Sequence, residues 1–459
     1  MTVERAAGPG APAKVDGGPD LGAPRDVVFI ARQLEKAGFS TWAVGGAVRD
    51  ALAGRTPGDW DLTTAARPGD VRRLFRRTVP VGIEHGTVGV LGKDGRMYEV
   101  TTFRRDVETD GRHARVLFSD TVEDDLQRRD FTINAVAWHP LTHEVRDPHG
   151  GAADLAAGIV RTVGEPAERF REDRLRVLRA LRFAGRFGLS VDAGTWEAAR
   201  AVADELPALS AERVREELMK VFREVDRPSD SLRLYEASGA LRSLYPELQA
   251  CVGVPDGDAE VWTHLLRTAD AAPRHRPHLR LSALLHDVGK PAVPFAAEGA
   301  EAFPGHAGAG AALARELMRR LRFSNAETDR AVHLVAQHSD LPSADAPAPE
   351  VRRWLRRVGP EHVWDLLRLR IADARARGGP EEMLRKVAAL RGRVRRVLSA
   401  GQALGIGDLA IGGAELRSLG LPAGPLYGEI LRDLLERVTD DPSLNRADLL
   451  VEIVRGRIS

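Results

Sequence analysis

The 459-residue sequence has a single cysteine, Cys251, and only 5% aromatic residues. One cysteine excludes an intrachain disulfide and any zinc site built from several cysteines. Lysine and arginine number 67 against 66 aspartates and glutamates, so the formal net charge is only +1. Without a global basic field, any contact with RNA must depend on local positive charge. We find no apolar run of membrane-spanning length and no signal peptide, so we expect a cytoplasmic location and no membrane partner.

The chain is long enough for two to four domains. Residues 1–24 are rich in glycine, alanine and proline and lack apolar periodicity, which predicts a disordered tail. Arginine runs occur at 352–357 and 391–396. Such runs serve either as solvated helix faces or as tracks for RNA, and the sequence leaves both interpretations open.

The stretch 42–61 has the residue types that hold a triphosphate. The predicted strand 41–44 ends at Gly45 and Gly46, and a helix follows. Glycines before a helix let backbone N–H groups approach an anion closely. Arg49, one turn into that helix, is placed to add a bidentate phosphate contact.

Two carboxylates, Asp59 and Asp61, end the same stretch. Residues two apart in an extended segment point the same way, so both can bind Mg²⁺, which prefers hard oxygen ligands. Glu99, in a predicted strand at 97–103, is either a third carboxylate of this site or an exposed strand residue. A glycine pair or an Asp-x-Asp alone is usually a turn, but the two together are far more specific.

Gly-Gly-x-Val-Arg-Asp followed by Asp-x-Asp resembles the class II nucleotidyltransferases, the family of tRNA CCA-adding enzymes and bacterial poly(A) polymerases. Arg128-Arg129-Asp130 matches the second motif of that family, which implies that Arg129 contacts the nucleotide. Taken by itself, an Arg-Arg-Asp sequence is usually a surface ion pair.

The stretch 172–183 is predicted as one helix with a polar row that recurs every third residue. It matches the family's Glu-Asp-x-x-Arg motif, in which side chains take the place of a nucleic-acid template. The resemblance implies that Asp173 and Arg176 select CTP and then ATP, and that Arg179 and Arg182 reach the triphosphate. The alternative is a helix with i,i+3 ion pairs.

Histidines and aspartates of a second set begin near Val261. Imidazoles and carboxylates from several helices suit a divalent transition metal such as Mn²⁺, Ni²⁺, Fe²⁺ or Zn²⁺. Leu-Leu-His-Asp-Val-Gly-Lys-Pro resembles the HD-domain phosphohydrolases, which implies either a metal-dependent hydrolase or a relic fold that serves as scaffold. The candidate ligands are His264, His286, Asp287, His306, His338 and Asp373.

These resemblances imply an α+β protein. A nucleotidyltransferase head with a small mixed sheet like that of polymerase β (25–155) precedes a helical neck and body that bind RNA and nucleotide (156–255). An HD domain (256–375) and a helical tail that holds the tRNA elbow (376–459) follow. The implied activity is template-independent addition of CCA to the 3′ end of tRNA, from CTP and ATP, by two-metal chemistry with Mg²⁺.

Three alternatives stay open. A poly(A) polymerase, or an enzyme that adds only CC or only A, would use the same head. The polar segment 104–115, predicted as a mobile loop, argues against a CC-only enzyme. An HD phosphohydrolase with an inert head, or an RNA-binding protein without catalysis, would not need the carboxylate pair at 59 and 61. The sequence does not indicate an oligomeric state.

Overall fold

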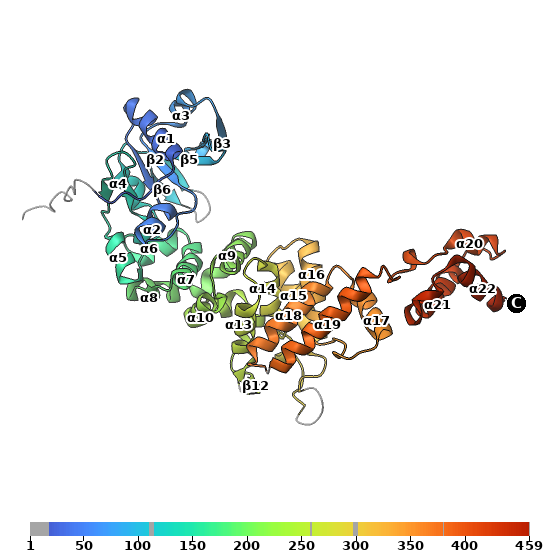
Figure 1. Ribbon diagram of the computed structural model, residues 1–459. Helices are drawn as coiled ribbons and strands as arrows, with labels where there is room; N and C mark the ends of the chain where they lie inside the picture. Colours follow the sequence, from blue (N-terminus) through green and yellow to red (C-terminus); the bar gives the residue numbers. More distant parts are fainter. Residues whose placement is uncertain (1–17, 110–113, 258, 297–301, 380, 459) are drawn as a thin grey trace, which may run out of the picture. The chain divides into compact units, whose positions relative to one another are not determined.

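The computed structural model of this chain describes residues 18–109, 114–257, 259–296, 302–379 and 381–458. It divides into two compact units, Met1–Glu217 with Asp230–Leu244, and Leu218–Ser229 with Tyr245–Ser459. The first unit contains the main sheet and the second is almost entirely helical (Figure 1), which confirms the predicted α+β class. Most of the predicted disordered tail, 1–24, lies outside the described residues.

Seven strands form the sheet of the first unit. They are β1 (Thr41–Val44), β2 (Asp61–Thr64), β3 (Thr78–Gly82), β4 (Thr87–Leu91), β5 (Met97–Thr102), β8 (Ala137–Trp138) and β9 (Val145–Arg146). Their order is β3-β4-β5-β2-β1-β8-β9. Only β2 and β5 pair in parallel, and every other pair in this sheet is antiparallel. The sheet places the end of β1 beside the start of β2.

Both faces of the sheet are covered, which explains why β1 is buried along its whole length. Ala43 belongs to the core cluster that contains Val27 and Ile30 of the first helix. Trp42 belongs to a second cluster, with Leu126. Neighbouring strand residues point to opposite faces, so the strand contributes to two cores at once.

The helices of the first unit surround this sheet and continue beyond it. They are α1 (Arg25–Lys36), α2 (Gly46–Leu52), α3 (Pro68–Leu74), α4 (Val122–Gln127), α5 (Gly151–Ala157), α6 (Pro166–Glu172), α7 (Leu175–Phe187), α8 (Ala193–Ala201) and α11 (Ala240–Leu244). Helices α9 (Ala211–Glu224) and α10 (Pro228–Ser238) cross the division between units. The short strands β10 (Ile159–Val160) and β11 (Ser190–Val191) pair in parallel.

Two predictions of secondary structure are wrong. The helix predicted over 172–183 is broken at Asp173, whose extended backbone separates α6 from α7. Its carboxylate accepts a hydrogen bond of 3.0 Å from the backbone N–H of Leu175, and such local bonds compete with helix continuation. The mobile loop predicted over 104–115 contains an antiparallel hairpin, β6 (Arg104–Thr109) and β7 (Ala114–Phe118).

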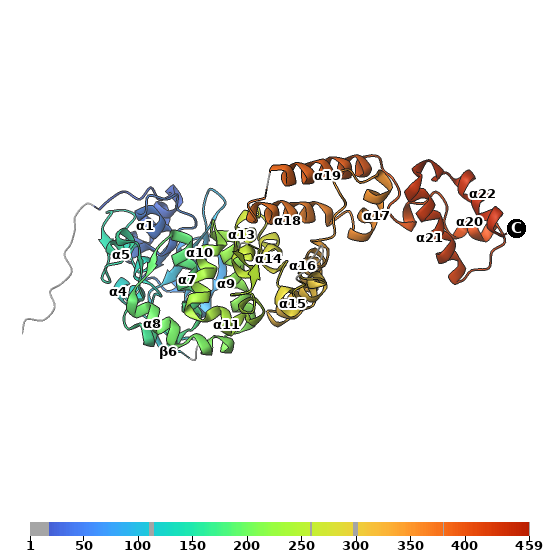
Figure 2. The ribbon, with the colours of Figure 1, turned by 90° about the horizontal axis from the view of Figure 1, so that it is seen from below.

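The second unit is a helical body followed by a smaller helical cluster. Its helices are α12 (Pro246–Gln249), α13 (Val261–Ala271), α14 (Pro277–Leu285), α15 (His306–Arg320), α16 (Asn325–Gln337), α17 (Ala348–Val358), α18 (Val363–Ala376), α19 (Glu381–Ser399), α20 (Gly413–Ser418), α21 (Pro425–Asp440) and α22 (Ala447–Ile458). Strands β12 (Pro255–Asp256) and β13 (Ala259–Glu260) pair before α13. Figure 2 shows α19 lying along α18. Among the described residues, no helix has the length and apolar character to cross a bilayer.

Candidate active site and metal centre

The end of β1 lies against a carboxylate and a guanidinium. Val44 pairs with Asp61 across the antiparallel strands, so Gly45 follows directly beside that carboxylate. A Cβ at Gly45 would lie 3.1 Å from Nη1 of Arg129 and 4.0 Å from Oδ2 of Asp61. The backbone of Gly45 also has a φ of +77°, a conformation that favours glycine. Glycine at this position therefore leaves space between the predicted nucleotide-binding and metal-binding groups.

A second carboxylate approaches Asp61 from β5. Leu62 pairs with Val100 in the parallel register, and Asp61 and Glu99 each precede one of these residues. Both side chains thus leave the sheet on the same side. Asp59 is exposed and lies in the turn before β2, so the extended segment predicted to contain both aspartates begins only at Asp61.

The electrostatics of this corner favour a cation. Asp61 keeps exposed surface, but loss of surrounding water and then repulsion from Glu99 raise its pKa to about 6. Asp59 adds to that repulsion, and the guanidinium of Arg129 partly opposes it. Excess negative charge on clustered carboxylate oxygens fits a hard divalent ion, which would relieve the repulsion.

The guanidinium of Arg129 is hydrogen-bonded on one side and has one donor without a partner among the described residues. Its Nη2 donates to Oδ2 of Asp125 at 3.0 Å, and its Nη1 lies 3.4 Å from the carbonyl oxygen of Asn134. Its buried Nε has no hydrogen-bond partner among the described residues. A half-buried guanidinium with an unsatisfied donor fits contact with an anion.

Arg49, predicted to contact phosphate, points into the protein. Its side chain is buried, and its residue is 4% exposed. Nε and Nη2 donate to Oδ1 of Asp50 at 2.9 and 2.7 Å, and Nη1 donates to Oδ1 of Asn134 at 2.7 Å. The guanidinium also lies over the ring of Phe187, 4.4 Å from its centroid. Arg49 therefore connects α2 to Asn134 and to Phe187, the last residue of α7.

The two residues predicted to select the base do not pair with each other. Oδ2 of Asp173 accepts from Nη2 of Arg213 at 2.7 Å. Nη1 of Arg176 donates to Oε2 of Glu172 at 2.5 Å and to a backbone carbonyl. Both Asp173 and Arg176 are half-buried at the junction of α6 and α7. Each side chain is therefore oriented by a separate partner.

The next two arginines of the row also have carboxylate partners. Nε of Arg179 donates to Oδ2 of Asp130 at 2.7 Å. Although burial alone would raise it, the charge of Arg179 and a hydrogen bond from Asn134 hold the pKa of Asp130 below its ordinary value. Arg182 is 3% exposed and forms a 2.8 Å bond with Glu217. Sequence reasoning missed Asp130, Asn134 and Glu217, because their arginine partners are distant in sequence. It also missed Asp125, although Arg128 and Arg129 follow it within four positions.

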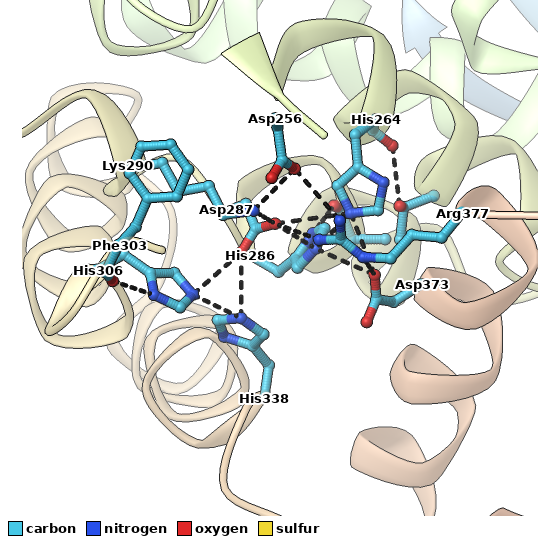
Figure 3. A network of polar contacts seen from close by, with 12 residues as sticks. Asp256, His264, His286, Asp287, Lys290, Phe303, His306, His338, Asp373 and Arg377 are labelled. Atoms are coloured by element: carbon cyan, nitrogen blue, oxygen red, sulfur yellow. Dashed lines mark hydrogen bonds and ion pairs between the residues drawn. The ribbon is translucent and has the colours of Figure 1, made fainter. Parts of the chain in front are cut away.

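The second predicted set comes together inside the helical unit (Figure 3). One ligand lies on α13, two follow α14, one begins α15, one follows α16 and one lies on α18. All six are buried, and they are His264, His286, Asp287, His306, His338 and Asp373. The structure therefore brings every candidate ligand of this set to one place.

Asp287 lies at the centre of this cluster (Figure 3). Its Oδ2 lies 3.5 Å from Nε2 of His264 and 3.3 Å from Nε2 of His286. Its Oδ1 lies 3.1 Å from Nε2 of His306 and 3.2 Å from Nε2 of His338. Asp287 thus belongs to two groups of three, one with His264 and His286 and one with His306 and His338. The candidate ligand atoms of each group lie within 4.8 Å of one another, so either group could hold a metal ion. The shared carboxylate is placed to bridge two such ions.

The ring orientations also suit a metal. Three histidines use Nδ1–H to donate to a backbone carbonyl, which leaves the Nε2 lone pair directed at the centre. The three bonds are His286 to Ala283 at 2.7 Å, His306 to Phe303 at 2.8 Å and His338 to Val335 at 2.7 Å. Imidazole nitrogens with two carboxylates form a donor set that fits a divalent transition metal.

Cationic side chains adjoin the same cluster. Nζ of Lys290 lies 2.7 Å from Oδ2 of Asp287 and 2.8 Å from Asp256, and Arg377 contacts the same two carboxylates. Arg370 contacts Asp373 at 2.5 Å. A cavity of about 570 Å³ adjoins these groups. Sequence reasoning missed Asp256 and Arg377. Of these neighbouring charged residues, only Lys290 lies within the Leu-Leu-His-Asp-Val-Gly-Lys-Pro stretch and could have been identified from it.

Three family models match successive parts of the chain. They are the poly A polymerase head domain at 41–161, the probable RNA and SrmB-binding site of polymerase A at 188–251, and the HD domain at 260–377. The head and HD matches imply use of a divalent metal. They follow the order of the sheet-bearing and helical regions described above.

Curated relatives are similar over less than half of the chain. The CCA-adding enzyme of Anoxybacillus flavithermus is 44% identical over 200 residues, which is 43% of this chain and 50% of the relative. That of Leuconostoc mesenteroides is 45% identical over 201 residues, 43% of this chain and 49% of the relative. The chain spans about half the length of the curated relatives it matches.

Solved structures extend the similarity over nearly the whole chain. The Bacillus stearothermophilus CCA-adding enzyme in complex with CTP superposes with a TM-score of 0.72 and 30% identity, over 94% of this chain and 98% of that one. The Thermotoga maritima CCA-adding enzyme complexed with tRNA shares the fold, with a TM-score of 0.55 and 20% identity over 94% and 95% of the two chains. The near-complete match at 30% identity shows that this chain belongs to the family of CCA-adding enzymes.

Proposed function

We propose that the protein adds CCA to the 3′ end of tRNA from CTP and ATP, without a nucleic-acid template. The observation that carries the proposal is the corner where Gly45, Asp61 and Arg129 meet beside Glu99. Open backbone, clustered carboxylates and a partly unsatisfied guanidinium are the groups that a nucleoside triphosphate and its cations require. A relative of 30% identity has been solved with CTP, which supports the same substrate class here.

The carboxylates supply the metal site in this proposal. Mg²⁺ held by Asp59 and Asp61 would activate the tRNA 3′-hydroxyl and stabilise charge on the α-phosphate and the leaving pyrophosphate. Glu99 adds charge to the same site. Gly45 and Gly46 let the triphosphate lie close to the backbone. Arg129 donates to the phosphate oxygens from a fixed position.

Base choice is assigned to the junction of α6 and α7. A carboxylate and a guanidinium there offer acceptors and donors for the Watson–Crick edges of cytosine and adenine. Asp173 and Arg176 are half-buried, so both retain surface for a ligand. We assign Arg179 to the triphosphate side of the same helix. The buried bonds of Arg49 and Arg182 support a role in holding these elements in place.

The decisive experiment uses tRNAs that lack all, part or only the last nucleotide of the CCA end. Each tRNA is given CTP and ATP separately and together, and the 3′ ends are sequenced. We expect two C additions, then one A, and then arrest. Continued A addition would indicate a poly(A) polymerase, and arrest after CC or acceptance of ATP alone would indicate a specialised enzyme.

A second function is favoured by the buried histidine cluster. We propose that the histidines and aspartates of this HD site would hold divalent transition metal ions, which would supply activation of water for hydrolysis of a phosphate ester. Lys290, Arg370 and Arg377 provide positive charge for an anionic substrate.

The domain limits, a tRNA-elbow contact by the tail at 376–459 and a cytoplasmic location stay predictions.

Metal content tests the HD proposal directly. The purified protein is loaded in turn with Mn²⁺, Ni²⁺, Fe²⁺ and Zn²⁺, and bound metal and hydrolysis of a chromogenic phosphate ester are measured. Asp287→Ala should remove all bound metal because its two oxygens serve both histidine pairs, whereas His338→Ala should spare the group of His264 and His286. Hydrolysis that is unchanged in Asp287→Ala, or wild-type protein without bound metal, would refute the assignment.

A further inference from the structure

A fully buried carboxylate holds both arginines of the Arg-Arg-Asp motif. Asp125 lies on α4 and has 0% exposure. Its Oδ1 accepts from Nε and Nη2 of Arg128, at 3.0 and 2.7 Å. Its Oδ2 accepts from Nη2 of Arg129 at 3.0 Å. One side chain therefore sets the orientation of two guanidinium groups.

Asp125 is ionised in this environment. Burial alone would raise its pKa, but the charge of Arg129 and then that of Arg128 hold the pKa of Asp125 below its ordinary value. Two guanidinium groups share a single carboxylate, so the cluster keeps a surplus positive charge. In a buried place, such a surplus is stabilised by a further anion.

The surplus positive charge lies beside the proposed active site, on the guanidinium of Arg129. Arg129 presents Asp125 with one edge of its fork, while its Nη1 lies on the side of Gly45 and Asp61. The rigid guanidinium plane means that fixing one edge also fixes the other. Its Nε has no hydrogen-bond partner among the residues described for this chain.

The contacts of Asp125 with Arg128 and Arg129, here called the clamp, also extend to the junction of α6 and α7. The backbone carbonyl of Arg128 accepts a 3.4 Å hydrogen bond from Nη2 of Arg176. Asp125 holds the side chain of Arg128, and so steadies the segment on which Arg176 rests. A loss at Asp125 would therefore disturb Arg129 first and Arg176 second.

We propose that Asp125 is a positioning residue of nucleotidyl transfer, which fixes Arg129 between the glycine pair and the catalytic carboxylates so that it meets the triphosphate in one orientation. This inference rests on the proposed function. Asp125 itself is fully buried and has no exposed surface to offer a nucleotide or a metal ion. Its effect must therefore pass through the arginine, and this makes it separable from a general contribution to folding.

A double-mutant cycle tests the proposal. The variants are Asp125→Asn, Arg129→Ala and the two combined, with Glu123→Gln as control because that exposed residue lies on the same helix and loses the same charge. Loss of one charged donor to the transition state typically costs about 10²-fold or more in rate. We expect Asp125→Asn to lower kcat/KM for CTP by about 10- to 100-fold, and to add less than about 3-fold in the Arg129→Ala background. Glu123→Gln should match the wild type.

Additive losses would overturn the proposal, because Asp125 would then act independently of Arg129. Thermal unfolding of each variant is followed in parallel, and if Asp125→Asn does not fold, Asp125→Glu replaces it in the same cycle. A partial recovery of kcat/KM by Asp125→Glu supports the clamp. A fall in kcat/KM that is fully accounted for by loss of folded protein in the thermal unfolding measurement refutes it. CTP binding by calorimetry gives the same cycle without catalysis. Non-additive binding in a protein that extends no tRNA would thus refute the proposed function and leave the clamp supported.

Discussion

Nε of Arg182 lies 2.8 Å from Oε2 of Glu217, in an ion pair that is almost entirely removed from solvent. The pair joins α7, which carries the predicted nucleotide-binding row, to α9. Breaking a buried pair leaves one charge uncompensated, which typically costs about 3–5 kcal/mol. The pair is therefore a structural determinant of the helical region next to the head.

We expect Glu217→Ala to lower the free energy of unfolding by about 3–5 kcal/mol, measured by urea denaturation. Affinity for CTP at low temperature should fall much less. As a matched control, Glu197→Ala removes an exposed glutamate whose 3.6 Å pair with Arg200 lies in solvent, and it should cost about 0–1 kcal/mol. Equal destabilisation by the two variants would contradict the buried-pair argument.

Removal of the carboxylate pair should abolish nucleotide incorporation. In Asp59→Ala with Asp61→Ala, the cluster loses two of the three acids that support the metal site, and incorporation should fall at least about 10³-fold. Gel-shift binding of tRNA and any phosphatase activity of the HD site should persist, because these acids lie at the start of β2 and in the turn before it, within the first unit. Retained incorporation would count against the metal assignment.

Changes at the junction of α6 and α7 should affect base choice more than triphosphate affinity. Asp173→Ala or Arg176→Ala removes one of the groups proposed to meet the base edge, so the ratio of kcat/KM for CTP and ATP should move toward one. Single-nucleotide incorporation on tRNAs that lack the last two or only the last nucleotide of the CCA end measures this ratio. Arg171→Ala, at an exposed position of α6, serves as control. Unchanged fidelity in both variants would end the side-chain template idea.

The reactivity of Cys251 provides a pH test of the second unit. Burial raises the pKa of this thiol to about 12, so it stays protonated in the folded protein at pH 8–10. The unfolded thiol ionises near its ordinary pKa of about 8.5, so this group stabilises the fold fully below that pH and progressively less above it. Iodoacetamide should label native protein slowly and urea-unfolded protein rapidly at pH 9, and mass spectrometry reports the single site. Rapid native labelling would refute the burial.

Local pattern in the sequence was sufficient for much of the head. The predicted strand at 41–44 has the same bounds in the structure, because glycine ends it and a helix follows at once. All six candidate HD ligands stand out in the sequence, since histidine and aspartate are uncommon within apolar helices, and all six are buried in the structure. That they bind a metal stays a prediction. The glycine pair and Asp61 were also placed correctly next to each other in space.

Partners distant in sequence were beyond this kind of reasoning. Arg49 was expected at a phosphate, yet it bonds to Asn134, 85 positions away. Asp173 was expected beside Arg176, yet it bonds to Arg213, 40 positions away. Helical spacing tells which residues share a face, but not which tertiary neighbour that face will meet. Asp125 was missed for another reason: Arg128 and Arg129 lie only three and four positions away, but that both guanidinium groups turn back to one buried carboxylate is visible only in the structure.

The three histidine bonds to backbone carbonyls have one spacing in common. Each imidazole donates to the residue three positions earlier in its own turn: His286 to Ala283, His306 to Phe303 and His338 to Val335. The orientation of these three rings is thus fixed within their own short peptide segments, without a contact from a neighbouring helix. A cation arriving at this centre would find its ligands preorganised, so capture would require almost no rearrangement, and selectivity among ions would be governed by how far the helices can adjust their separation.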